Sequence, residues 1–219
     1  MSEHQPFSQV LRRATASAHE RAHDSTYMDA LLGGRLALDD YATLVVQYWH
    51  VYGAIEEGAD RLGADPVVGP FAVDALRRRE AIAADLAFLR GPGWADDLTA
   101  LPATAAYVER VRETVEEWPA GWVAHHYTRY LGDLAGGQAV RGLLRRTYGV
   151  TGDGARFYDF AALGPVPPFR AHYRALLDSA AWDDVERARI ADEACRAFEL
   201  NIAMLAELAG TVPPEHLAA

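Results

Sequence analysis

The stretch that decides the fold is Tyr127-Thr128-Arg129-Tyr130-Leu131-Gly132-Asp133-Leu134-Ala135-Gly136-Gly137-Gln138. It lies within residues 121–148, whose apolar spacing predicts one long helix. Interior glycines interrupt this pattern, and each costs a helix about 1 kcal/mol relative to alanine. Gly132 and Gly136 are four residues apart, so they share a helix face that lets a second helix or a flat ligand approach the backbone closely. The spacing alone leaves both alternatives open.

Polar neighbours of the glycines favour a ligand over dry helix packing. Arg129 and Asp133 are four residues apart and can pair on one face. A carboxylate next to a stretch of backbone without side chains can order water beside a ligand that packs against that backbone. Tyr127 and Tyr130 add two hydroxyl groups to the same segment.

The rest of the chain also reads as helical, with no convincing strand and no repeat. The spacing predicts helices over residues 8–23, 27–32, 39–62, 71–89, 102–118, 121–148, 168–179 and 184–208, with Ser8 as the N-cap of the first. A loop over 149–168 holds one helical turn near Phe157. We expect a single all-α domain over residues 1–219, a multi-helix bundle with flexible ends at 1–7 and 210–219.

Composition narrows the class of protein. The 219 residues are 50% hydrophobic, enough for one full core, and the net charge of −10 argues against a nucleic-acid partner. Cys195 is the single cysteine, so nothing indicates an oxidising compartment. No signal pattern and no run of about 18 apolar residues is present, which predicts a cytoplasmic protein without a membrane anchor.

The 127–138 segment resembles the distal helix of haem oxygenases. The resemblance implies that haem b, both substrate and cofactor, is sandwiched between a proximal helix and a kinked distal helix. Gly132, Gly136 and Gly137 would then bring backbone against the haem, and Asp133 would organise water that delivers a proton to iron-bound oxygen. The family reaction opens the ring at a meso carbon and yields biliverdin, carbon monoxide and ferrous iron.

The segment from Leu11 to His19 resembles the proximal helix of the same family, which makes His19 the expected axial ligand of the iron. A rival motif overlaps it, because residues 19–23 also satisfy the HExxH pattern of zinc hydrolases, with Glu20 as general base. The extended form of that pattern needs a glycine and a third histidine, where this chain has Thr26 and Asp29. The role of His23 stays open.

Further matches extend the resemblance over most of residues 11–208. The resemblance implies that the haem propionates contact Arg12, Arg170 and Arg174, assisted by the hydroxyl of Tyr127, and it favours cleavage at the α-meso carbon. Arginine suits this task because its planar fork matches a carboxylate. Tyr52 and Arg129 would support Asp133 through water. The remaining haem contacts are expected from Met28, Thr128 and Phe198.

The expected function is therefore that of an enzyme, a haem-degrading monooxygenase that uses O₂ and external electrons. The chain shows no flavin or nicotinamide motif, so a ferredoxin with its reductase or a flavoprotein reductase is the implied electron donor. A non-catalytic haem carrier or sensor of the same fold is the main alternative, although storage alone does not require Asp133. The alanine- and arginine-rich composition suggests a bacterial source.

Overall fold

The structure is a computed structural model that describes residues 5–218. Within these residues it contains α-helices and short 3₁₀ turns and no strand, which confirms the all-α class. The α-helices are α1 (Phe7–Ala14), α2 (Ala16–His23), α3 (Thr26–Leu32), α4 (Leu38–Leu62), α5 (Arg79–Arg90), α6 (Pro102–Glu117), α7 (Pro119–Tyr148), α8 (Val166–Ser179), α9 (Asp184–Thr211) and α10 (Pro214–Leu217). The 3₁₀ turns are η1 (Gly69–Phe71), η2 (Asp74–Leu76), η3 (Trp94–Asp96), η4 (Arg156–Tyr158) and η5 (Ala161–Leu163).

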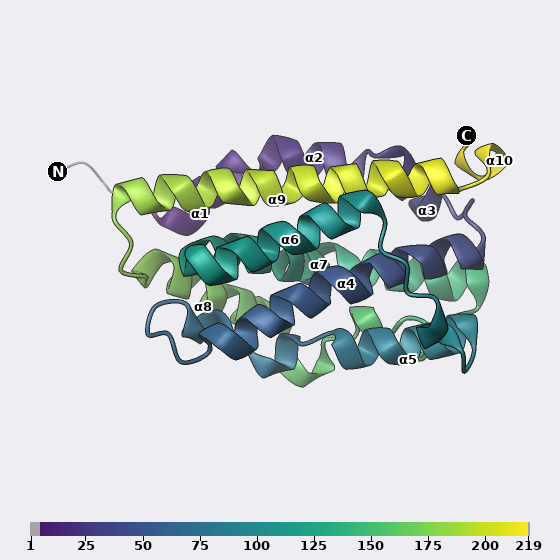
Figure 1. Cartoon of the computed structure of the whole chain (residues 1–219), viewed down its shortest axis with the longest axis horizontal. Coiled ribbons are helices and arrows are strands. Elements are labelled where there is room, and N and C mark those ends of the chain that lie inside the picture. The colour runs from purple at the N-terminus through teal and green to yellow at the C-terminus, as the bar shows by residue number, and fades with distance from the viewer. Residues whose placement is uncertain (1–4, 219) are drawn as a thin grey trace.

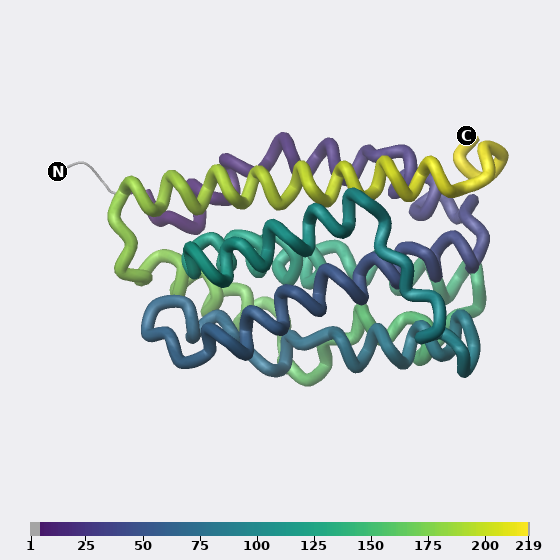
Figure 2. Tube along the Cα trace, viewed as in Figure 1, coloured from purple at the N-terminus to yellow at the C-terminus, as the bar shows by residue number. Residues whose placement is uncertain are grey.

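The helices form an elongated bundle in which the N-terminal helices lie against the last long helix along one edge. Figure 1 shows α9 running the length of that edge beside α1, α2 and α3, while α4 and α5 lie on the opposite edge and α6 and α7 lie between them. The trace in Figure 2 shows the same pairing of the first helices with the last long helix. This arrangement leaves α2 and α7 on either side of the candidate site.

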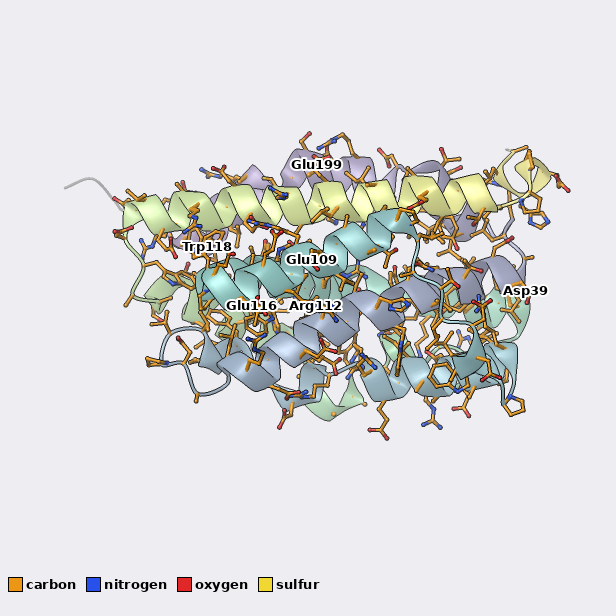
Figure 3. The ribbon with its side chains drawn as sticks, in the orientation of Figure 1. Asp39, Glu109, Arg112, Glu116, Trp118 and Glu199 are labelled. Carbon is orange, nitrogen blue, oxygen red and sulfur yellow. The ribbon has the colours of Figure 1, made fainter. Side chains whose placement is uncertain are left out.

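Helix α4 forms much of the core through one apolar face. Six residues at the three- and four-residue spacing of that face are all buried: Tyr41, Leu44, Val45, Tyr48, Tyr52 and Ile55. Exposed ion pairs join α4 to α6, where Figure 3 labels Arg112 and Glu116. Such surface pairs each contribute little to stability, so the apolar face of α4 is what fixes its position.

The first predicted helix is two helices, because the α-helix stops at Ala14 and restarts at Ala16. Thr15 lies at the break, and its hydroxyl donates to the Leu11 carbonyl at 2.9 Å, a bond that competes with the backbone ladder. The N-cap prediction is wrong. Pro6 occupies the N-cap position and makes no side-chain cap bond, whereas Ser8 lies within α1 and its hydroxyl donates to Asp178.

The predicted helix over 71–89 begins eight residues too early. Only Arg79–Arg90 is α-helical, and the preceding residues form η1 and η2. The physical reason lies on another helix: the Glu56 carboxylate accepts hydrogen bonds from the backbone N–H groups of Arg78 and Arg79 and so begins α5 there. Glu56 and Arg78 are 22 residues apart in the sequence, so the local spacing of apolar residues does not reveal this contact.

The remaining boundaries agree to within three residues, and α7 runs without interruption from Pro119 to Tyr148. The glycines therefore do not break the hydrogen-bonded helix. At the chain ends, the structure places Phe7 in α1 and residues 214–217 in α10. Residues 1–4 and 219, for which flexibility was expected, lie outside the described residues, and the flexibility of both ends stays a prediction.

Candidate active site

A slot opens between the N-terminal helices and the middle of α7. It consists of two adjoining cavities, of about 300 Å³ and about 160 Å³, that share His19, Thr128, Gly132 and Phe198. Most of the residues predicted from the sequence line one of the two. The larger cavity adds Arg12, Tyr127, Arg170 and Arg174, and the smaller adds Met28, Arg129 and Asp133.

His19 stands on α2, on the wall of the slot that faces α7. Its ring meets the Phe198 ring edge-on, with the ring centroids 5.9 Å apart. The side chain is exposed and has no hydrogen-bonding partner among residues 5–218. Its ring nitrogens are therefore free, and a neutral imidazole in this position can bind a metal.

Gly132 provides the opposite wall, where the backbone of α7 is bare. A Cβ atom added at Gly132 would meet nothing within 4 Å, so the missing side chain leaves open space beside the slot. Gly136 is equally open but lines neither cavity. Gly137 faces the core instead, because a Cβ there would lie 2.9 Å from the Tyr158 ring. Only Gly132 among the three directly borders the slot.

Asp133 is connected to Arg129 through Tyr52 rather than by the direct pairing expected from their spacing. The Tyr52 hydroxyl donates to the Asp133 carboxylate, and Arg129 Nε donates to the Tyr52 oxygen at 3.2 Å. A third partner is Asn201 of α9, whose Oδ1 accepts from Arg129 Nη1 at 2.6 Å. The direct pairing was wrong because the tyrosine from α4 lies between the two charged groups.

Opposing electrostatic effects act on the Asp133 carboxyl, and the effect of burial is the largest. Burial raises the pKa of Asp133, while Arg129, the Tyr52 hydroxyl and Arg78 act in the opposite direction. Burial also raises the pKa of Tyr52, so its hydroxyl keeps its proton and remains a donor. A carboxyl with a raised pKa beside an open slot is a candidate general acid.

A basic edge closes one end of the larger cavity. Arg12 of α1 and Arg170 and Arg174 of α8 all line it together with Tyr127. The three arginines also lie close enough to Tyr127 to affect its hydroxyl group. Burial raises the pKa of Tyr127, and the three positive charges oppose that rise. Arg170 Nε is buried without a hydrogen-bond partner among the described residues. Buried polar atoms normally have a partner, so this edge suits a ligand with carboxylate groups.

Comparison with known proteins agrees with this geometry. The family model described as heme oxygenase matches residues 5–207. "Heme oxygenase 1" of Nostoc sp. is 36% identical over 203 residues, covering 92% of this chain and 85% of the relative. The crystal structure of heme oxygenase-1 from Synechocystis sp. in complex with heme superposes with a TM-score of 0.91 at 32% identity, covering 94% of each chain. Heme oxygenase from Leptospira interrogans gives a TM-score of 0.89 at 31% identity, covering 93% of this chain and 100% of that one.

This chain belongs to the haem oxygenase family. The family resemblance, the fold and the haem-degrading activity expected from the sequence are thereby confirmed. The slot also fits the family's substrate on its own features. A flat ring needs a wall without side chains, which Gly132 offers, and the buried Arg170 Nε lacks the acceptor that a propionate would supply.

Two residues of this haem oxygenase site had been given no role from the sequence. Asn201 orients Arg129, and the Tyr48 ring lies under the Arg129 guanidinium, 4.7 Å from ring centroid to Cζ. Both carry a usable signal, since Tyr48 precedes Tyr52 by four residues and Asn201 follows Phe198 by three. Each pair therefore shares a helix face.

The rival zinc motif lacks a third ligand. Within the described part of the chain, no group of three or more histidine, cysteine or acidic side chains could hold a metal ion. His23 lines the smaller cavity and pairs with Asp24, with His23 Nδ1 3.0 Å from Asp24 Oδ1.

Among residues 5–218, none of the helices combines the length and the apolar character that a membrane span requires.

Proposed function

We propose that His19 binds the haem iron and that Asp133 supplies the proton for oxidative cleavage to biliverdin, carbon monoxide and ferrous iron. The observation that carries the proposal is the Tyr52–Asp133–Arg129 group beside the bare backbone of Gly132. A haem carrier needs an iron ligand and an apolar slot, but it has no use for a carboxyl with a raised pKa at the open face.

Haem supplies the iron at which dioxygen reacts, and its ring is the substrate. The residues of this chain bind the haem, orient the acid and donate the proton. Gly132 leaves room at the haem face, and the Asp133 carboxyl, whose pKa is raised by burial, would donate the proton there. The Tyr52 hydroxyl fixes the carboxyl, and Arg129, held by Asn201, fixes Tyr52. This chain of contacts keeps the acid in one orientation.

Regiochemistry depends in this proposal on the basic edge. Arg12, Arg170 and Arg174 bind the two propionates and so fix how the ring is rotated in its plane. We expect the α-meso carbon to be the one that is cleaved. Chromatography of the biliverdin isomers tests this, and a β or δ product would contradict it.

Electrons reach the site from outside the chain, from a ferredoxin with its reductase or from a flavoprotein reductase, and the reaction runs in the cytoplasm.

A basic surface at the end of α7 suits an acidic ferredoxin. Arg145 and Arg146 are exposed there, and Arg141 and Arg145 line a cavity of about 410 Å³. Arg141 lies nine residues beyond Gly132, about 14 Å along the helix. Opposite charges accelerate such encounters in a chain whose net charge is −10.

One experiment tests the activity and the iron ligand together. Haem, a reductant system and air are added to the protein, and the absorption spectrum is recorded over time. We expect the Soret band to fall while a biliverdin band grows. His19→Ala should lose both the Soret maximum of the wild type and turnover, and added imidazole should restore them. A stable haem complex without biliverdin would indicate a carrier, and unchanged spectra in His19→Ala would refute the ligand assignment.

A further inference from the structure

Helix α1 has no N-terminal cap of its own and receives one from α8. Pro6 at the N-cap position makes no side-chain bond. Instead, the backbone N–H of Ser8 donates to Asp178 Oδ1 at 2.7 Å, and the Ser8 hydroxyl donates to Asp178 Oδ2 at 3.1 Å. Both carboxylate oxygens of Asp178 therefore hold one residue of another helix. A carboxylate at this position also complements the positive end of the helix dipole.

The bridge between Ser8 and Asp178 lies one helical turn from the basic edge on both helices. On α1, Ser8 precedes Arg12 by four residues, and on α8, Asp178 follows Arg174 by four. Residues four apart share a helix face, so the bridge and the arginines lie on the same side of each helix. Ser8 itself lines the larger cavity together with the three arginines, whereas Asp178 lines none of the described cavities.

We propose that Asp178 is a positioning residue that determines regiochemistry. By holding Ser8, it fixes the separation between Arg12 of α1 and the arginine pair of α8, and hence the rotation of the haem in its plane. This inference rests on the proposed role of these arginines as propionate ligands. Asp178 acts only through α1, because it lines neither part of the slot.

The position of α1 depends on its packing against α8 and α9 and on this bridge. A helix of eight residues is not stable alone, so packing and capping fix where it lies. Phe7 and Leu11 are buried, and the Phe7 ring meets the Trp182 ring edge-on at 5.9 Å between centroids. These apolar contacts remain when the bridge is removed. Loss of the bridge should therefore let α1 shift along α8 without unfolding it.

The test compares biliverdin isomers and haem affinity in three variants. Asp178→Ala removes both acceptor oxygens, and Ser8→Ala removes one of the two hydrogen bonds. The matched control is Glu109→Gln, an exposed carboxylate on α6 that Figure 3 labels and that lines neither cavity of the slot. We expect Asp178→Ala to turn a single main isomer into a mixture and to weaken haem binding by about three- to tenfold. Ser8→Ala should act in the same direction but less.

The combined variant separates positioning from simple destabilisation. Ser8→Ala together with Asp178→Ala should give the same isomer mixture as Asp178→Ala alone, because both act through one bridge. The inference is overturned if the isomer ratio and the haem affinity of both single variants match those of Glu109→Gln while only the thermal midpoint falls. Should Asp178→Ala fail to fold, Ser8→Ala, which keeps every apolar contact of α1, decides by the same criterion.

A reference variant distinguishes this inference from the proposal beneath it. Arg174→Ala should change the isomer ratio and weaken haem binding if the arginines hold the propionates. A changed ratio in Arg174→Ala with an unchanged ratio in Asp178→Ala would overturn only the positioning role. An unchanged ratio in Arg174→Ala would overturn the propionate assignment and the positioning role with it.

Discussion

At the scale of single residues, the glycines of α7 serve different purposes although they look alike in the sequence. Gly132 borders the slot with open space where a side chain would point, whereas Gly137 is glycine because the Tyr158 ring occupies that space. The sequence could predict that the backbone of the 127–138 segment is approached closely by a second helix or a flat ligand. It could not predict which glycine meets the ligand and which meets the core, because that depends on the rotation of α7 against η4.

Alanine substitutions should separate these two roles. Gly132→Ala should leave the free protein as stable as the wild type or more so by up to about 1 kcal/mol, because alanine is the better helix former. Its methyl group should nevertheless reduce haem affinity and biliverdin formation. Gly137→Ala should lower the free energy of unfolding by about 1–3 kcal/mol through overpacking against Tyr158. Thermal unfolding without haem and haem titration measure the two effects. Equal losses of stability in both variants would contradict this assignment.

At the scale of elements, contacts between helices that are distant in the sequence determine helix starts and side-chain pairings that local patterns could not predict. Glu56 of α4 determines where α5 begins, and Asp178 of α8 caps α1. Tyr52 of α4 separates Arg129 from Asp133, so their helical spacing alone gave a wrong pairing. Helix α7 was predicted to within two residues from its own pattern, because its apolar spacing is a local signal.

Helix α7 also carries a buried histidine that makes the fold sensitive to acid. Burial lowers the pKa of His126 to about 3, and its Nδ1 lies 2.9 Å from the Tyr173 hydroxyl oxygen. In the unfolded chain His126 takes up a proton below about pH 6.5, which the folded protein does not do until about pH 3. The unfolded state therefore binds more protons in this range, and stability falls as the pH falls from 6.5 toward 3.

The glutamine variant isolates this effect. Between pH 7 and pH 5 His126 should cost the wild type about 2 kcal/mol of unfolding free energy, and His126→Gln should lose about that much less over the same interval. Chemical denaturation at the two pH values measures the difference, so any pH-independent cost of the substitution cancels. Equal losses in the two proteins would show that His126 carries no such penalty.

At the scale of the whole molecule, a net charge of −10 makes the basic surface at the end of α7 stand out. Replacement of Arg145 by glutamate should slow electron delivery from an acidic ferredoxin about tenfold at low salt, and the difference should shrink as salt screens the charges. The matched control is Arg196→Glu on α9, another exposed arginine. Both variants should match the wild type with a small-molecule reductant. A similar slowing in both variants would refute a docking role for Arg145.

The central claim is that Asp133, held by Tyr52, makes this haem-binding slot catalytic. The most direct measurement is the yield of biliverdin per bound haem in the wild type and in Asp133→Ala, recorded spectroscopically in air with the same reductant. We predict that both proteins bind haem, that the wild type converts most of it to biliverdin, and that Asp133→Ala forms little or none. An unchanged biliverdin yield in Asp133→Ala would contradict the claim.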